Sequence, residues 1–243
     1  MLQNFLKIFS DQINGVIHVG AHLGQEVTLY NEYGINKIYL FEPQKKIFEK
    51  LNKNMKKHKH VCCYNFALGS ENKLSTLNLS NSNFGLSSSI LSPQLHLKVQ
   101  PKIEFTETEN IIIKRFDNLD ILPLNFLTID VQGFELEVLK GFGDLITDVE
   151  FIFTEINTKS LYKDNALVKD IDRYLSQFNF ERIYTNIDCF KFYGDAFYLK
   201  RTNPLFEKLR KNKILNKIFI SNSYLTLKKI LYPVKLFKLS FNL

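Results

Sequence analysis

Cysteine is scarce in this sequence, which has only Cys62, Cys63 and Cys189 among its 243 residues. Two of the three are adjacent, so the chain lacks the even, spaced cysteine framework that stabilises small secreted domains. The sequence therefore predicts a reducing compartment, and we expect a cytoplasmic protein.

Zinc-ligand spacing is missing from the histidines as well as from the cysteines. His58, His60 and His96 stand in polar segments rich in lysine, and none of them is spaced from a cysteine as a zinc ligand would be. We therefore expect no structural zinc and assign no metal ligand. His58 and His60 are interpreted as an exposed helix end without a role.

Long apolar stretches are missing too. The sequence has no run of about 18 apolar residues, which argues against an integral membrane protein. The first nine residues are interrupted by Gln3, Asn4 and Lys7, and no small-residue cleavage site follows them. They predict a first helix and not a signal peptide.

The positive charge of the chain is confined to its C-terminal end. The formal net charge is +7, and residues 204–243 hold nine lysines and arginines against Glu207 alone, which leaves residues 1–203 almost neutral. We therefore expect one domain, residues 1–203, and a basic amphipathic tail, residues 204–243, with the junction at Pro204. An almost neutral body argues against nucleic acid as a partner.

Short apolar runs alternate with helical patterns through the first 200 residues, and this alternation predicts an α/β fold. We expect a mostly parallel, Rossmann-like sheet with helices on both faces. Its seven strands are predicted near residues 16–19, 37–41, 61–66, 126–130, 149–154, 181–184 and 196–199, and its helices near 25–33, 44–57, 135–140 and 166–177. An insertion interrupts this alternation, with a hairpin expected near 74–79, a Ser/Asn-rich segment at 80–92 and an extended run at 110–116. Insertions of this kind often cover an active face.

The first motif runs from Val16 to Glu26, where an apolar strand enters the turn Gly20-Ala-His-Leu-Gly24 and then a helix. Glycines at such a turn let the backbone approach a ligand, and the helix N-terminus offers free N–H groups. Taken alone, the segment is equally compatible with glycines placed for packing.

The second motif is an apolar strand followed by Glu42, which lies 22 residues after Gly20. A carboxylate about 20 residues beyond a glycine turn can accept hydrogen bonds from both ribose hydroxyls of an adenosine. The alternative is that Glu42 caps the helix that starts at Pro43. Because His22 stands where the dinucleotide fingerprint needs its middle glycine, the turn favours S-adenosylmethionine over NAD.

The third motif runs from Phe126 to Gly141, with Asp130 at the C-terminal end of an expected strand. In an open α/β sheet, ligands bind beyond the carboxyl ends of the strands at the switch point, where Asp130, Gln132 and Glu135 would gather. Asp130 and Glu135 could instead stabilise the start of a helix without a role in catalysis.

Taken in order, these segments resemble the FkbM-type methyltransferase family. The resemblance rests on residues 17–26, 40–43, 65–69, 85–90, 129–141 and 154–157 and spans about residues 13–200. Its most specific part is the run Asp-Val-Gln-Gly-x-Glu-x-x-x-Leu-x-Gly that begins at Asp130. The resemblance implies a class I methyltransferase fold, S-adenosylmethionine as cofactor, and methyl transfer to a hydroxyl, commonly of a sugar or natural product. One departure is His18, where the family commonly has Asp, and it bears on cofactor affinity.

The motifs and the resemblance together give a candidate site. The cofactor-binding candidates are Gly20, His22, Gly24, Glu26, Glu42, Ala67 and Asp130. The candidates for the general base are Asp130, Glu155 and His22, and the candidates for contacting the acceptor are Ser87, Ser88, Gln132 and Glu135. Asp130 could face the cofactor and leave Glu155 on the acceptor side. A carboxylate that acts as the base should have a raised pKa, and two converging carboxylates could also hold a divalent cation. The serines also suit a solvated loop.

The tail interleaves Leu, Ile and Phe with lysines from residue 206 onward. Such a segment can adsorb to an anionic membrane, or it can pack on its own domain or on a partner subunit. We therefore predict an O-methyltransferase that acts on a glycan or related small-molecule hydroxyl, cytoplasmic or peripheral at the inner face of the membrane. The alternatives are a catalytically inactive nucleoside-binding or interaction protein on the same fold and, third, a nicotinamide oxidoreductase.

Overall fold

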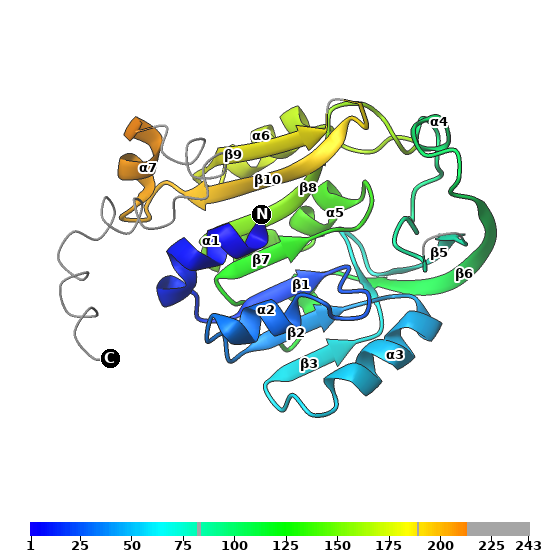
Figure 1. Ribbon diagram of the computed structural model, residues 1–243, viewed down its shortest axis with the longest axis horizontal. Helices are drawn as coiled ribbons and strands as arrows, with labels where there is room; N and C mark the ends of the chain where they lie inside the picture. Colours follow the sequence, from blue (N-terminus) through cyan, green and yellow to red (C-terminus); the bar gives the residue numbers. More distant parts are fainter. Residues whose placement is uncertain (82–83, 189, 213–243) are drawn as a thin grey trace, which may run out of the picture.

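One seven-stranded sheet organises the molecule, as Figure 1 shows for the computed structural model, which describes residues 1–81, 84–188 and 190–212. The strand order is β3 (Val61–Tyr64), β2 (Ile38–Phe41), β1 (Val16–Val19), β7 (Phe126–Ile129), β8 (Phe151–Asn157), β10 (Tyr193–Lys200) and β9 (Phe180–Asp188). Within this sheet β10 pairs antiparallel with β8 and β9, and the other pairs are parallel. The predicted mostly parallel sheet is confirmed.

Helices cover both faces of this sheet. As a result, β1, β2 and β7 are buried along their whole length. The face that carries Val16 packs against α1 (Leu2–Phe9), α2 (Val27–Glu32), α3 (Lys45–Met55) and α7 (Phe206–Asn212). The face that carries Ile17 and Val19 packs against α5 (Glu135–Lys140) and α6 (Val168–Ser176). The short 3-10 turns η1 (Ser10–Gln12), η2 (Phe116–Asn118) and η3 (Gly143–Asp148) complete the connections. The Rossmann-like architecture follows from this two-sided burial.

The beginning of the predicted tail packs against the domain. Leu205, Phe206 and Leu209 are buried in the same core cluster as Phe5 of α1 and Phe197 of β10. The packed core therefore includes residues that the sequence assigned to the tail. Most of the predicted basic tail, residues 213–243, lies outside the described residues, as does Cys189. In the part of the chain that is described, no helix is both long and apolar enough to cross a membrane.

The insertion forms a small second sheet at the end of the main sheet toward which β1, β2 and β7 point (Figure 1). Its order is β4 (Ala67–Leu68), β6 (Phe105–Lys114) and β5 (Lys73–Ser80). The hairpin predicted at residues 74–79 is wrong, because these residues lie within one strand, β5, which pairs antiparallel with β6. The segment contains neither Gly nor Pro, the residues that a tight turn usually needs, and this favours a continuous strand. The short helix α4 (His96–Val99) lies between β5 and β6 in the chain.

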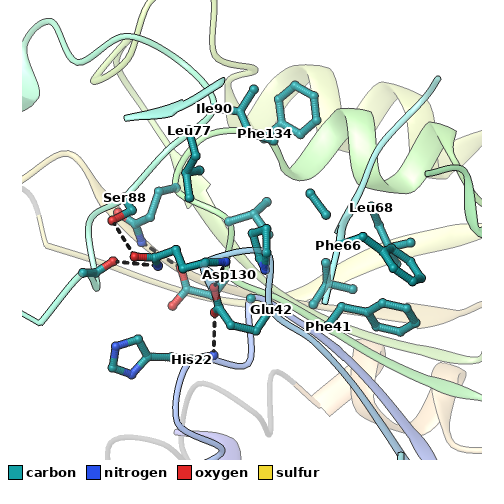
Figure 2. Close-up of a pocket in the computed structure, with 18 of the residues that line it drawn as sticks. His22, Phe41, Glu42, Phe66, Leu68, Leu77, Ser88, Ile90, Asp130 and Phe134 are labelled. Carbon is teal, nitrogen blue, oxygen red and sulfur yellow. Dashed lines mark hydrogen bonds between the residues drawn. The ribbon is translucent and has the colours of Figure 1, made fainter. Parts of the chain in front are cut away.

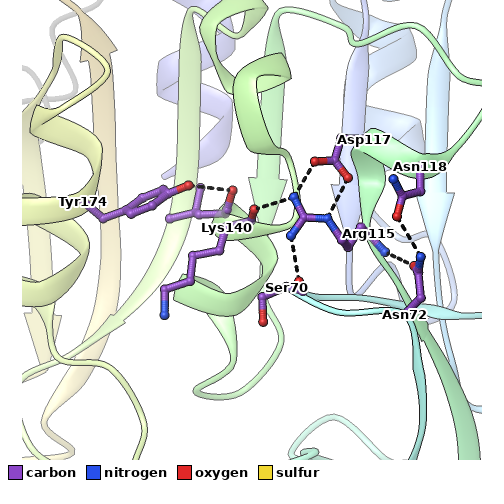
Figure 3. Close-up of polar contacts among 8 residues, drawn as sticks. Ser70, Asn72, Arg115, Asp117, Asn118, Lys140 and Tyr174 are labelled. Atoms are coloured by element: carbon purple, nitrogen blue, oxygen red, sulfur yellow. Dashed lines mark hydrogen bonds and ion pairs between the residues drawn. The ribbon is translucent and has the colours of Figure 1, made fainter.

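Arg115 fastens the small sheet to the main domain (Figure 3). Its guanidinium donates to the Asp117 carboxylate (Nε to Oδ1, 2.8 Å) and to the carbonyl of Ser70 (Nη1 to O, 2.7 Å). A longer bond of 3.5 Å reaches the carbonyl of Lys140 at the end of α5. The Arg115 side chain is 29% exposed, so water screens these charge-assisted bonds only in part.

Replacing Arg115 with alanine is expected to lower the free energy of unfolding by about 2 kcal/mol, which for a chain of this length lowers Tm by about 4–8 °C. Differential scanning calorimetry measures the shift. The matched control is Arg173→Ala, because the Arg173 side chain is 72% exposed and pairs with Asp170 one helical turn away at 3.4 Å. Equal shifts in the two variants would contradict the assigned role of Arg115.

Candidate active site

The carboxyl ends of β1 and β7 form the switch point of the sheet, because the chain proceeds outward from them in opposite directions. Gly20 and Asp130 follow these two strands directly. A Cβ atom on Gly20 would lie 1.9 Å from the Asp130 carbonyl oxygen, and Gly20 has a φ of +83°. Only glycine lets the two strand ends approach this closely.

A cavity lies at this switch point, and Figure 2 shows that its wall has a polar and an apolar part. The apolar part includes Phe41, Phe66, Leu68, Leu77, Ile90 and Phe134, and the polar part includes His22, Glu42, Ser88 and Asp130. This division fits an adenosine, with the base among apolar side chains and the ribose beside a carboxylate. We call it the cofactor cavity.

Five of the seven predicted cofactor residues line this cavity: Gly20, His22, Glu42, Ala67 and Asp130. Gly24 has a packing role, because a Cβ there would lie 2.9 Å from the side chains of Leu51 and Met55 on α3. Glu26 lines a neighbouring cavity, together with His18 and Asp130.

Glu42 is 3% exposed and links the glycine turn to α3. Its Oε2 accepts the backbone N–H of His22 (3.0 Å), and its Oε1 accepts that of Gln44 (2.8 Å), the residue that precedes α3. The alternative that Glu42 caps the following helix therefore accounts for its bond to Gln44 but not for its bond to His22. Burial raises the pKa of Glu42 to about 7, although both backbone bonds oppose the shift.

His22 helps to hold residues 84–88 over the cofactor cavity. Its Nδ1 lies 3.1 Å from Gln25 Nε2, which can only donate, so the ring proton is on Nε2 and is donated to the carbonyl of Phe84 (2.8 Å). A second contact comes from Gln44, whose Nε2 donates to the carbonyl of Gly85 (3.3 Å). Since both ring nitrogens of His22 are engaged, the carboxylates are the better candidates for a general base.

Gln132 joins the two carboxylates that the sequence singled out. Its Nε2 lies 2.7 Å from Asp130 Oδ1 and 3.2 Å from Glu155 Oε2, and its Oε1 accepts the hydroxyl of Tyr162 (3.1 Å). Asp195 stands opposite Glu155 in the β8–β10 ladder and lines the same neighbouring cavity. Three carboxylates therefore converge at the strand ends.

The environment of Asp130, Glu155 and Asp195 raises the pKa of each carboxyl group. The Asp130 side chain is open to the cavities, yet protein surrounds it, and this burial raises its pKa. Burial, together with the nearby Asp130 and Glu135 carboxylates, raises the pKa of Glu155 well above its usual range. Burial and the nearby Asp130 raise the pKa of Asp195 to about 6. Within residues 1–81, 84–188 and 190–212, no group of three or more His, Cys, Asp or Glu is arranged to hold a metal ion.

Glu135 lies beneath the site. It is fully buried, and its Oε1 accepts the backbone N–H groups of Val131 (3.3 Å) and Gly133 (3.0 Å). These bonds fix the loop that presents Gln132, whose φ of +56° is unusual for a residue with a side chain. Glu135 therefore positions the loop, in line with the alternative that it stabilises the local backbone.

A second cavity of about 210 Å³ adjoins the first. Its lining comprises Leu86, Ser87, His96, Gln100, Gln132, Glu155, Leu161, Tyr162 and Tyr193. Leu86 and Gln132 line both cavities, so the two meet beside Gln132. Of the two predicted serines, Ser87 faces this second cavity and Ser88 faces the cofactor cavity.

Several residues of the site were missed by the sequence analysis: His96, Tyr162, Tyr193 and Asp195. None belongs to a recognisable motif, and His96 was interpreted as part of a polar segment. One signal was available for Asp195, since it is the acidic residue in the mostly apolar and aromatic strand β10.

His18, at the position where Asp is common, is 4% exposed. Its Nδ1 lies 3.1 Å from the hydroxyl of Tyr30, which in turn lies 3.3 Å from Thr128 Oγ1. Burial lowers the pKa of His18, so the ring is neutral near pH 7. A neutral ring can form hydrogen bonds here without adding a positive charge to the neighbouring cavity, which His18 lines together with Glu26 and Asp130.

This sheet, with two cavities at the carboxyl ends of its strands, has the Rossmann-like fold of class I methyltransferases. Residues 18–182 match the family described as the methyltransferase FkbM domain. The chain belongs to this family, and its cofactor is S-adenosylmethionine, as predicted.

Two relatives illustrate the similarity. The 2-O-methyltransferase NoeI of Sinorhizobium fredii (strain NBRC 101917 / NGR234) is 24% identical over 150 residues, which are 58% of this chain and 62% of that protein. The crystal structure of methyltransferase FkbM from Methylobacillus flagellatus KT superposes with a TM-score of 0.53 at 12% identity, covering 76% of this chain and 43% of that one. The chain thus spans less than two thirds of either relative, and the structural similarity shows the fold.

Proposed function

We propose that the protein transfers the methyl group of S-adenosylmethionine to a hydroxyl oxygen of a sugar, a surface glycan or a related small molecule. The observation that carries this proposal is the meeting of the two cavities at Gln132. There one amide group is hydrogen-bonded to Asp130 of the cofactor cavity and to Glu155 of the second cavity. The similarity to a 2-O-methyltransferase supports oxygen as the atom that is methylated.

The cofactor cavity has groups that fit each part of the cofactor. Glu42 would accept hydrogen bonds from the ribose hydroxyls, and Phe66 and Leu68 would contact the adenine. Asp130 would face the methionyl end, where the ammonium and sulfonium charges are attracted to a carboxylate. Bound S-adenosylmethionine supplies an electrophilic methyl group.

Glu155 is the residue that we assign to accept the acceptor proton. It lines the second cavity, and its raised pKa makes it a stronger base than an exposed carboxylate. Its Oε2 is already bonded to Gln132, so Oε1 takes the hydroxyl proton. Gln132 keeps both carboxylates in place, and such positioning supplies much of the rate of an in-line transfer.

The test is calorimetric titration with S-adenosylmethionine, S-adenosylhomocysteine and NADH, followed by transfer of a radiolabelled methyl group to a panel of p-nitrophenyl glycosides. We expect both adenosyl ligands to bind, NADH not to bind, and at least one glycoside to gain an alkali-stable O-methyl group. Cofactor binding without transfer to any glycoside would favour the inactive nucleoside-binding alternative, and tight NADH binding would refute the assignment.

A further inference from the structure

Large apolar side chains that are exposed to solvent gather beside the second cavity. Among the described residues there are seven such side chains, and four of them stand on segments that line or adjoin this cavity: Phe84, Leu86, Leu97 and Phe190. Phe190 is 86% exposed and Phe84 is 82% exposed, so both rings lie almost fully in water. Single apolar side chains are ordinary on a protein surface, whereas a group of them in one place marks an interaction site.

Three segments at the carboxyl end of the sheet carry these side chains: the loop after β5, the helix α4, and residues 190–192 between β9 and β10. Figure 1 shows α4 and the connection between β9 and β10 at the end of the sheet toward which β1 and β7 point. These two are joined directly, because Gln100 Nε2 donates to the hydroxyl of Tyr193 at 3.1 Å. Leu86, Gln100 and Tyr193 line the second cavity, so the three segments border it.

Exposed lysines stand among these apolar side chains. The segments around the cavity, residues 84–104, 158–167 and 188–193, hold five lysines against Glu104, Asp164 and Asp188. The lysines are Lys98, Lys102, Lys159, Lys163 and Lys191, and all five are exposed. Asp188 pairs with Lys191 at 3.6 Å, so one of the three acidic groups is already neutralised. Together with the four apolar side chains, the lysines form a surface of net positive charge that we call the cavity rim.

We propose that the cavity rim docks the protein on an anionic lipid bilayer and turns the second cavity toward the lipid. The exposed phenylalanines and leucines enter the interfacial region of the bilayer, while the lysines contact lipid phosphates. Lysine is depleted from protein–protein interfaces, and leucine offers no ring on which a nucleic acid base stacks. A lipid surface therefore fits this mixture of side chains better than a protein or a nucleic acid does. The inference concerns where the protein binds and not which atom it methylates.

The experiment measures sedimentation of the full chain with vesicles of phosphatidylcholine, with and without phosphatidylglycerol. It compares the wild type with Phe190→Ser and with a double charge reversal, Lys98→Glu and Lys102→Glu. The control for Phe190→Ser is Leu122→Ser, because Leu122 is 76% exposed but precedes β7 at the amino end of the sheet. The control for the charge reversal is the pair Lys56→Glu and Lys57→Glu, two exposed lysines between α3 and β3.

The wild type is expected to sediment with the vesicles that contain phosphatidylglycerol and to be released as the salt concentration rises. Phe190→Ser and the rim charge reversal should each weaken this binding by about 10-fold, and both controls should stay within about twofold of the wild type. The affinity for S-adenosylmethionine and Tm should be unchanged in all four variants, because the substituted side chains are exposed and line neither cavity.

A wild type that stays in solution beside anionic vesicles overturns the inference. Vesicle binding that neither rim variant weakens also overturns it, because the contact then lies elsewhere, as on the basic tail. Light scattering and titration with poly(U) test the other two occupants. Self-association or poly(U) binding that Phe190→Ser abolishes, without vesicle binding, identifies a second copy or a nucleic acid and refutes the lipid assignment. No methyl acceptor is present in these measurements, so the proposed function and this inference fail separately.

Discussion

Glu155→Gln is expected to lower kcat by about 100- to 10,000-fold, the usual contribution of a general base, while the affinity for S-adenosylmethionine changes by less than about threefold. The substitution keeps the shape of the side chain and its contact with Gln132 but removes the atom that takes the proton. Glu155 lines the second cavity and not the cofactor cavity, so the cofactor contacts are preserved. Single-turnover methyl transfer at saturating cofactor measures the effect.

The matched control is Glu150→Gln, just before the opposite end of the same strand, where Glu150 accepts a bond from Asn203 (3.2 Å). Its kcat should equal that of the wild type. Asp130→Ala is expected to weaken cofactor affinity as well as turnover, because Asp130 lines the cofactor cavity. A Glu155→Gln protein that keeps full kcat would refute Glu155 as the base.

Glu42→Ala is expected to weaken S-adenosylmethionine binding by about 100-fold, because the ribose loses two hydrogen bonds to a buried charged group. Calorimetric titration measures this loss. The variant also leaves the N–H groups of His22 and Gln44 without their partner, so Glu42→Gln serves as the milder companion.

The affinity of the wild type should also rise with pH, by up to about tenfold between pH 6 and pH 8, because the pKa of Glu42 is about 7 and the carboxylate is the better acceptor for ribose hydroxyls. In the free protein the linkage has the opposite sign. A carboxyl whose pKa is raised by folding stabilises the fold below its unfolded pKa of 4.5, and this contribution is lost as the pH rises through 7. Glu42→Gln should flatten both profiles, and an unaltered pH dependence in that variant would assign it to another carboxyl.

The main sheet could be predicted because its signals are local. β1, β2 and β7 are four-residue, mostly apolar runs, each followed by a polar motif that marks the strand end. The insertion could not be predicted to the same degree. The segment around His96 takes its position from bonds to Leu161, a residue 65 positions away, and no local pattern reports such a contact.

The residues of the candidate site also differ in how far the sequence predicts their positions. Gly20 and Glu42 each follow a predicted strand directly and Asp130 ends one, so their convergence follows from the parallel sheet. The position of Asp195 beside Glu155 depends on the register of an antiparallel pair, which a single sequence does not fix. The place of Asp195 beside Glu155 therefore became known only from the structure.

The contact between Gly20 and the Asp130 carbonyl has a consequence for comparing related sequences. Geometry alone excludes every other amino acid at position 20, whether or not a ligand binds. A descendant that had lost all activity would therefore still retain this glycine for as long as β1 and β7 stay paired. Glu155 is under no such geometric constraint. A related protein that has lost catalytic activity would therefore be recognised by a substitution at Glu155 and not at the glycine.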